Sequence, residues 1–577
     1  MRRRRFIELA GLAAGAVVVG PAPPGVAAPG SLHPHLRPAS PLLVKGITPF
    51  VDALPIPATM PTTHRIDGVA TYDVAMIPFK QKLHRDLAPT TLWGYHGACP
   101  GPTIEARRGV PIQVLWRNAL PSTHALRIDT SLHGAEPDKP SVRTVVHVHG
   151  LKVLSDSDGY PDAWFTTDFA QKGPFFKDRI YDYPNDQRAA TLWYHDHAVG
   201  ITRLNIYMGL TGLYILRDDI EDSLNLPSGI YEIPLMIQDR NIAPDGSLVY
   251  PAPTVAPIAE FFGESILVNG KIWPYLTVEP RKYRFRILNA SNARFYRLSL
   301  VESDQAGNPT GHRGPSFVQI GSDGGLLSQP VSRASLDAAP GERLDVVVDF
   351  AHHAGNTFVL ANDAPAPFPE GGDVVPPHVM MFRVARSLRS PDTSSLPDRL
   401  PAVTRPDMAD VVRTRDLVLS ELELQLQSVD KSRSVDKTFV SLINNAHWDD
   451  PITERPRAGS TEIWRIINRT DDAHPMHVHL VQFQILDRQP FDLDQDSLTF
   501  TGPAVPPPDH EQFGLKDTVQ SHPGEVVRLL IKFDLPAGTL VRRDDLFRYA
   551  VHCHILEHEE NQMMRPYEVV GGADHTV

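Results

Sequence analysis

The side chains best suited to metal chemistry lie close together near the C-terminus. His552, Cys553 and His554 are consecutive, and His558 and Met563 follow five and ten residues after the cysteine. Two imidazoles, one thiolate and a weakly bound thioether are the ligand set of a mononuclear copper site that transfers electrons. Successive side chains of a strand point to opposite faces, so His552 and His554 face away from Cys553. These two histidines are left over, and the segment is therefore more than a simple electron carrier.

Three other segments repeat the His-x-His spacing of this run. Residues i and i+2 of a strand point to one face, so each pair can aim two imidazoles at one place. The four pairs are His147 with His149, His195 with His197, His477 with His479, and His552 with His554. Eight imidazoles that converge in this way can hold a cluster of about three metal ions, each with two or three nitrogens.

The mononuclear site needs donors from the face of the last strand that Cys553 uses. His474, His558 and Met563 supply them. Met564 is adjacent to Met563, so the ligand types alone leave open which thioether reaches the metal. Zinc also binds His and Cys. A thioether is not among its usual ligands, however, and the softness of this set favours copper.

Strand-like strings recur at similar wide intervals along the chain. Residues 112–118, 283–289 and 461–468 each end in asparagine. The later strings 191–197 and 548–554 end in His-x-His, whereas their counterpart at 357–363 has no histidine. Long periods of this kind are typical of repeated β-sandwich domains. We therefore expect metal ligands on the first and third modules, and a middle module that spaces them.

Length and composition agree with several β domains. The chain has 577 residues, too many for one hydrophobic core. With 54 prolines and 39 glycines it is rich in turn residues, which favours an all-β protein. The net charge of −12 comes without a basic stripe, so we expect no nucleic-acid partner. If Cys553 binds metal, the only other cysteine, Cys99, has no partner for an intramolecular disulfide.

The N-terminus has the pattern of a targeting signal over residues 1–30. Arg2 to Arg5 precede Phe6-Ile7-Glu8-Leu9 and a run of small apolar residues to Gly20. The run is too short to span a bilayer, and we expect no membrane span. Consecutive arginines before Phe-Ile-x-Leu resemble a twin-arginine export signal, and an ordinary secretory signal is the alternative. Both predict export to the periplasm or the exterior.

Together the ligand segments resemble those of multicopper oxidases, and in particular the bacterial spore-coat laccases and the bilirubin oxidases. Further segments make the resemblance specific: residues 50–57, 83–87, 92–95, 156–164, 267–275 and 501–508. The resemblance implies three cupredoxin-like Greek-key β-sandwich domains. We place these domains at residues 45–218, 219–385 and 411–577, with a linker rich in Pro, Ser and Arg at 386–410.

The resemblance also implies a role for each ligand of four copper ions. The type 1 copper takes His474, Cys553 and His558, with Met563 as the axial ligand because its spacing from Cys553 matches the family. The type 2 copper takes His147 and His477. The type 3 pair takes the remaining six histidines: His149, His195, His197, His479, His552 and His554.

The implied activity is that of a laccase-type oxidase. Phenols and aromatic amines lose electrons one at a time at the type 1 copper, and Cys553 is bonded to two cluster ligands, which is a short route for those electrons. O₂ is reduced to water at the cluster. Bilirubin, aminophenols, Mn ions and Cu(I) are alternative donors, although the low methionine count of 11 disfavours a dedicated Cu(I) oxidase. A copper-binding coat protein without catalytic activity is the alternative from another class.

Reduction of O₂ to water consumes protons, which neutral imidazole ligands do not readily supply. Acidic residues beside the cluster are therefore expected as a relay. The resemblance places Asp158 and Glu559 there. The structural alternatives are an ordinary turn aspartate at residues 156–159 and a surface glutamate next to a ligand.

Overall fold

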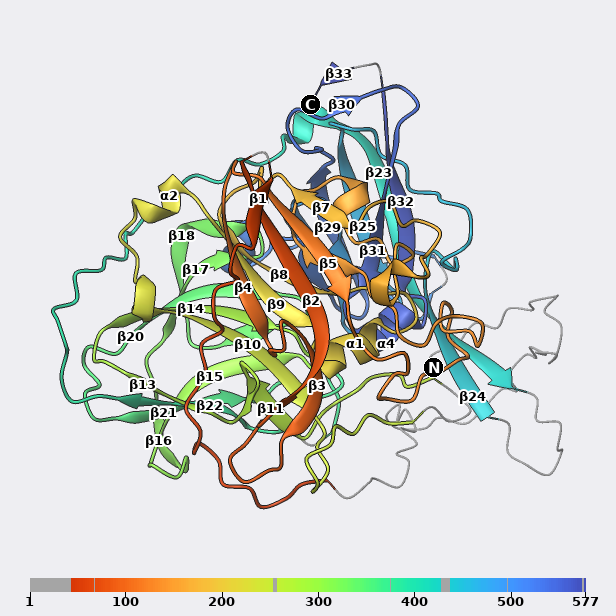
Figure 1. The fold of residues 1–577 in the computed structure, drawn as a ribbon. Helices are drawn as coiled ribbons and strands as arrows, with labels where there is room; N and C mark the ends of the chain where they lie inside the picture. Colours follow the sequence, from red (N-terminus) through yellow and green to blue (C-terminus); the bar gives the residue numbers. More distant parts are fainter. Residues whose placement is uncertain are drawn as a thin grey trace.

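The computed structural model describes residues 43–66, 68–252, 257–373, 375–426, 436–495, 497–572 and 575–576. The predicted signal at residues 1–30 lies outside this part of the chain. Strands dominate the described residues, and their sheets fall into three successive stretches of chain (Figure 1). None of the helices in the described ranges is long and apolar enough to cross a membrane.

The first module, from β1 to β9, has two sheets that enclose one apolar core. One sheet holds β1 (His64–Ile66), β2 (Val69–Gln81), β3 (Thr90–Tyr95), β5 (Ile112–Asn118) and β7 (Ile180–Tyr183). The other runs β4 (Gly101–Arg107), β9 (Thr211–Arg217), β8 (Ala190–Asp196), β6 (Val146–His149). Its helices are η1 (Ser155–Ser157), η2 (Thr167–Phe169) and α1 (Thr202–Met208).

The second module, from β10 to β22, repeats this plan around its own core. One sheet runs β12 (Lys271–Ile272), β11 (Ser265–Val268), β10 (Glu232–Arg240), β14 (Lys282–Asn289), β20 (Arg343–Asp349), β17 (Phe317–Ser322), β18 (Gly325–Arg333). The other runs β13 (Tyr275–Val278), β22 (His378–Val384), β21 (Thr357–Asn362), β15 (Tyr296–Ser303), β16 (Pro309–Arg313), with β19 (Leu336–Ala338) beside β15. Before it come α2 (Asp219–Asp222) and η3 (Gly229–Tyr231).

The third module, from β23 to β32, closes the chain. One sheet runs β24 (Asp436–Ile443), β23 (Val411–Leu426), β25 (Thr461–Asn468), β29 (Glu525–Lys532), β27 (Phe483–Pro490). The other runs β28 (Thr518–Ser521), β26 (His474–Val478), β31 (Leu546–Cys553), β32 (Met564–Val570). The remaining elements are η4 (Met408–Asp410), α3 (Asp509–Gln512), α4 (Leu556–Glu560), and the pair β30 (Leu540–Val541) and β33 (His575–Thr576).

The three strings that end in asparagine occupy equivalent places. β5, β14 and β25 each pair in parallel with an earlier strand of their module and antiparallel with a later one. Each asparagine is buried, and its side-chain oxygen accepts the backbone N–H two residues on; the acceptors are Asn118, Asn289 and Asn468. The predicted repeat of one β module is therefore confirmed, while the exact domain limits stay a prediction.

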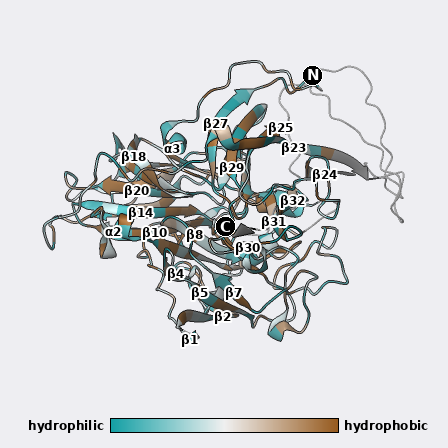
Figure 2. Cartoon of the chain, turned by 90° about the horizontal axis from the view of Figure 1, so that it is seen from above, coloured by the Kyte–Doolittle hydropathy of each residue, from teal (hydrophilic) through white to brown (hydrophobic). Residues whose placement is uncertain are grey.

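Alternation of side chains explains why these strings form sheets. Along β5 the apolar Ile112, Val114 and Trp116 are buried, and the residues between them are more exposed. Hydrophobic and hydrophilic residues are likewise interspersed along the strands in Figure 2. Residues 385–407 between the second and third modules form neither helix nor strand, where the linker is predicted.

Candidate metal centres

The strand β31 presents alternate side chains to two different environments. Tyr549, Val551 and Cys553 belong to the apolar core of the third module. Ala550 instead packs with Val145 of the first module, next to the histidines of β6. The first and third modules also meet where α1 lies beside α4 (Figure 1). Cys553 therefore points into the third module, whereas His552 points to the boundary between the two.

A mononuclear donor set surrounds Cys553. Its Sγ lies 3.6 Å from His474 Nδ1 and 3.9 Å from His558 Nδ1, and these two nitrogens are 3.2 Å apart. His474 Nε2 is 2.6 Å from Thr470 Oγ1, a contact that leaves Nδ1 to face the sulfur. The three donors are buried, so this His₂Cys set can enclose one ion.

The two adjacent methionines lie in different cores. Met563 shares the apolar core that contains Cys553, and its backbone N–H donates to His558 O at 2.8 Å. Met564 begins β32 and packs in the cluster that contains Ala550. The placement favours Met563 over Met564 as the thioether beside the ion.

Eight further imidazoles converge between the first and third modules. β6 aligns His147 with His195 of β8, and β26 aligns His477 with His552 of β31. The ligand nitrogens gather in three groups, each within 4.8 Å: His147, His149 and His477; His149, His195 and His554; His197, His479 and His552. The six predicted type 3 ligands thus form two triads, each with donors from both modules. The first triad is His149, His195 and His554, and the second triad is His197, His479 and His552.

The spacing within the second triad matches one metal ion. The Nε2 atoms of His197, His479 and His552 lie 3.2 to 3.3 Å apart. Ligands at about 2.0–2.1 Å around one tetrahedral ion are separated by roughly 3.3 Å. The three nitrogens therefore form one face of a coordination site.

Hydrogen bonds fix which nitrogen of several rings faces inward. The Nδ1 atoms of His147, His195 and His477 contact the backbone oxygens of Asp158, Asp196 and Asp517 at 2.6, 2.8 and 2.8 Å. Their Nε2 atoms are buried and have no hydrogen-bond partner among the described residues. Metal-bound histidines commonly use their outer nitrogen in this way, so these rings fit a metal centre.

The protonation of the donors also suits metal ions. Burial lowers the pKa of His147, His477 and His474 well below its usual value, so these rings stay neutral, the form that binds metal. Burial raises the pKa of the Cys553 thiol well above its usual value. A bound cation would compensate the thiolate charge there.

Comparison with known proteins agrees with this geometry. Two family models described as multicopper oxidase match residues 138–221 and 420–572. The chain is 47% identical over 538 residues to a laccase of Bacillus subtilis (strain 168), covering 90% of this chain and 98% of the relative.

The chain belongs to the multicopper oxidase family.

Two further proteins that resemble this chain support its membership. A laccase of Bacillus stratosphericus is 45% identical, with 90% of this chain and 99% of the relative covered. The crystal structure of a laccase from Pediococcus acidilactici matches with a TM-score of 0.68 at 27% identity, covering 93% of this chain and 97% of that one. The predicted all-β fold of cupredoxin-like domains is thereby confirmed, and family membership implies an oxidoreductase with four copper ions.

Two buried carboxylates of this multicopper oxidase contact the second triad. Asp158 Oδ2 lies 2.7 Å from His479 Nδ1. Glu559 Oε1 and Oε2 lie 3.2 and 3.1 Å from Nδ1 of His197 and His552. All three outer nitrogens of this triad thus face a carboxylate. The structure places both predicted relay residues beside the cluster.

The pKa values of these two acids shift in opposite directions. Burial raises the pKa of Asp158 to about 8, so this carboxyl holds a proton near neutral pH. Burial acts in the same direction on Glu559, but the His552 and His197 imidazoles outweigh it and bring the pKa of Glu559 well below its usual range. Acids whose pKa values are pushed apart can take different roles in proton transfer.

Asp517 is a cluster neighbour that the sequence patterns did not indicate. Its Oδ1 lies 3.0 Å from His149 Nε2, and its backbone oxygen contacts His477 Nδ1. The carboxylate is fully buried. Asp517 is distant from His149 in sequence, and only its position just before β28, beside β26, could have drawn attention to it.

Glu260 lies on the other side of the mononuclear site. Its Oε1 is 3.9 Å from His558 Nε2, and its side chain is 4% exposed. Burial raises the pKa of Glu260 well above its usual value, and the carboxylates of Asp472 and Glu421 add to the shift. The sequence patterns did not single out any of these acids. Acidic side chains therefore gather beside His558, a predicted ligand of the type 1 copper, and Glu260 stays protonated unless a cation compensates its charge.

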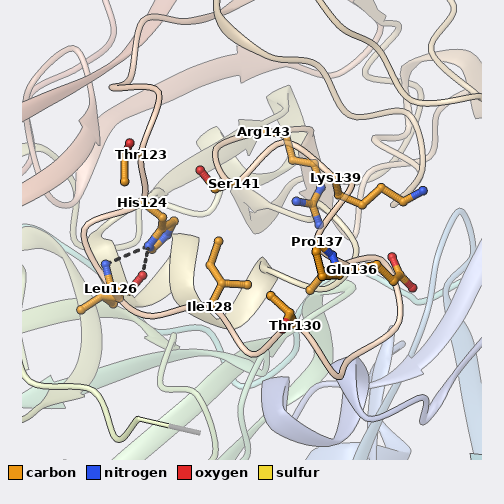
Figure 3. A pocket seen from close by; sticks show the side chains of 11 residues that line it. Thr123, His124, Leu126, Ile128, Thr130, Glu136, Pro137, Lys139, Ser141 and Arg143 are labelled. Carbon is orange, nitrogen blue, oxygen red and sulfur yellow. Dashed lines mark hydrogen bonds between the residues drawn. The ribbon is translucent and has the colours of Figure 1, made fainter. Parts of the chain in front are cut away.

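A cavity of about 270 Å³ in the first module is lined by the segment that connects β5 to β6 in the chain (Figure 3). His124 lines it, and His124 Nε2 lies 3.3 Å from Asn205 Oδ1. Asn205 Nδ2 in turn donates to Asp196 Oδ1 at 2.7 Å. Asp196 stands between His195 and His197 in the chain. Two side chains thus connect this cavity to the cluster, although none of its lining residues is a predicted copper ligand.

Proposed function

We propose that this multicopper oxidase is a laccase-type enzyme that removes single electrons from phenols and aromatic amines and reduces O₂ to water. The observation that carries the proposal is the geometry of β31. Cys553 faces one donor set, and its chain neighbours His552 and His554 face another. A storage protein has no need of two such sites joined through one residue.

Each ligand has a proposed role in this function. The type 1 copper would be held by His474, Cys553 and His558, with Met563 as the axial ligand. The type 2 copper would be held by His147 and His477. The type 3 pair would be held by the two triads His149, His195, His554 and His197, His479, His552. The bound coppers supply one-electron redox chemistry and the site for O₂.

The chain's own residues supply the electron path and the protons. Cys553 is covalently bonded to His552 and His554, so electrons reach the cluster ligands without a jump through space. Asp158 Oδ2 and the two oxygens of Glu559 contact outer imidazole nitrogens, so Asp158 can hold a proton beside the cluster and the ionised Glu559 can accept a proton and pass it on. Burial of all these groups excludes bulk water.

A second candidate donor is a metal ion such as Mn(II). Glu260 is the observation that favours it, because this buried acid, 3.9 Å from His558, stays protonated on its own and would ionise when a cation binds beside it. Cations, including protonated aromatic amines, would then be favoured over neutral phenols at this position. The small number of methionines disfavours Cu(I) as the main donor.

A donor panel on copper-loaded protein separates the candidates. O₂ consumption would be measured with a neutral phenol, an aromatic amine and Mn(II), in the wild type and in Glu260→Gln. The exposed Glu264→Gln, four residues away, is the matched control. The laccase proposal expects phenol oxidation in all three proteins. No O₂ consumption with any phenol would contradict it.

The same panel tests the metal-ion candidate. If Mn(II) is a donor, Glu260→Gln should raise its KM about tenfold or more, as loss of a charged partner does, and leave the KM for phenol unchanged. Equal KM values for Mn(II) in Glu260→Gln and the control would remove this candidate.

We also propose that the protein is exported in folded form to the periplasm or the exterior. The support is the arginine run Arg2 to Arg5 before Phe6-Ile7-Glu8-Leu9. Replacing Arg4 and Arg5 by lysine should retain the oxidase inside the cell, measured by activity in fractions. Undiminished export of that variant would indicate an ordinary secretory route.

A further inference from the structure

The fully buried Arg343, on β20 of the second module, bonds to all three modules. Its Nε donates to Thr191 O of the first module at 3.0 Å. Its Nη1 and Nη2 donate to Gly341 O and Asp323 O of the second module at 2.9 and 3.3 Å. The same two nitrogens donate to the two carboxylate oxygens of Asp517 in the third module. All five N–H donors of this guanidinium are thus used.

Asp517, which Arg343 holds in place, contacts two predicted copper ligands. Its Oδ1 accepts from Arg343 at 2.8 Å and lies 3.0 Å from His149 Nε2. The Nδ1 of His477 contacts the backbone oxygen of Asp517 at 2.8 Å. Thr518 Oγ1 donates to Asp517 Oδ1 at 2.9 Å and lies 3.0 Å from His149 Nε2. Both rings are therefore oriented by one short segment whose carboxylate is held by Arg343.

A second buried ion pair network supports the same segment from the second module. Lys516 Nζ lies 2.9 Å from both Asp323 Oδ2 and Glu342 Oε1. Asp323 Oδ1 also accepts the backbone N–H of Arg343 at 2.9 Å. The four side chains are nearly inaccessible to solvent. Residues 516 and 517 of the third module are thus clamped by charged groups of the second.

We propose that Arg343 is a positioning residue for the trinuclear copper centre, because it fixes Asp517, whose carboxylate orients His149 and whose backbone oxygen orients His477. The second module, which contributes no copper ligand to the predicted set, then completes the centre. The inference rests on the copper assignments proposed above. Partners of metal-bound histidines typically contribute 10- to 100-fold to metal affinity.

The test uses the full chain loaded with copper. Arg343→Lys keeps the charge but has three donors instead of a planar fork, and Asp517→Asn keeps the shape but removes the carboxylate. Arg284→Lys is the matched control, since Arg284 is a buried arginine of the same sheet that bonds to Asp345 and Glu221 instead. Three readouts are taken during titration with a chelator: total copper per chain, the type 2 copper signal in electron paramagnetic resonance, and the blue absorption of the type 1 copper.

In Arg343→Lys and Asp517→Asn we expect copper to leave the trinuclear centre at roughly 10- to 100-fold lower chelator concentration, seen in the copper per chain, with the blue absorption unchanged. In Arg343→Lys the loss should include the type 2 signal, because the segment that holds His477 is also released. Arg284→Lys should titrate like the wild type. Wild-type titration of both variants would overturn the inference, as would equal loss of type 2 copper in the Arg284→Lys control. Asp517→Asn remains a valid test if Arg343→Lys does not fold. A wild type that has no type 2 signal would overturn the copper assignment as well.

Discussion

Replacement of Glu559 by glutamine tests whether the acids beside the second triad supply protons. The carboxylate is 1% exposed, and its two oxygens lie 3.2 and 3.1 Å from Nδ1 of His197 and His552. A glutamine amide has one oxygen acceptor and, unlike a carboxylate, can neither take up a proton nor pass one on. Glu559→Gln therefore removes the acid and keeps the shape.

The structure separates two effects of this change. Both imidazoles lose the carboxylate charge and one of them loses its acceptor, which costs about 1.5–3 kcal/mol and weakens copper binding at that triad by roughly 10- to 100-fold. Excess copper restores occupancy. Loss of a positioned proton relay lowers kcat by about 10²- to 10⁴-fold, and excess copper does not restore it. Turnover should thus stay low in a variant that holds four coppers.

The assay is O₂ consumption at saturating donor and O₂, with copper per chain measured on the same sample. The rate is compared in H₂O and D₂O, because the variant should become more sensitive to the solvent isotope if proton supply limits it. Glu462→Gln is the matched control, since Glu462 is also a buried glutamate of the third module but pairs with Arg415. A fully loaded Glu559→Gln protein with wild-type kcat would refute the proton role.

Four other substitutions test three separate features: the axial thioether, a close backbone contact and the electron path. Met563→Leu should shift the blue absorption and the type 1 redox potential, whereas Met564→Leu should leave both unchanged; the reverse result would exchange their roles. Gly341→Ala should lower the free energy of unfolding by about 2–5 kcal/mol, because φ is +84° and the new Cβ would lie 2.8 Å from His554 Cδ2. Denaturant unfolding measures this, and wild-type stability would contradict the close contact. Cys553→Ser should abolish the blue absorption and phenol oxidation while type 2 copper remains; retained oxidation would contradict the electron path.

Successive side chains of a strand point to opposite faces, and this made it predictable that the last strand contributes ligands to two separate metal centres. Because Cys553 and His552 are neighbours on β31, alternation alone places them on opposite faces, and the structure has them in separate donor groups. The asparagines that end the repeated strings were also visible in the sequence. Their common hydrogen bond two residues on explains why this residue type recurs.

The grouping of the type 3 histidines into triads was beyond such patterns. His149 and His195 belong to the first module and His554 to the third, so their grouping depends on how the modules dock. Asp517 and Arg343 were missed for the same reason, because isolated charged residues have no period that marks them as buried. Glu260 precedes β11 in an irregular segment, whose path the sequence does not define.

The number of electrons delivered to each O₂ decides whether the two copper centres work together as one oxidase. Donor oxidised and O₂ consumed would be counted in one vessel, with a peroxide-specific probe present. If Cys553 and its chain neighbours connect the mononuclear site to a three-copper cluster, four one-electron donor oxidations are expected per O₂, with no hydrogen peroxide. Two oxidations per O₂ with matching peroxide would contradict the account.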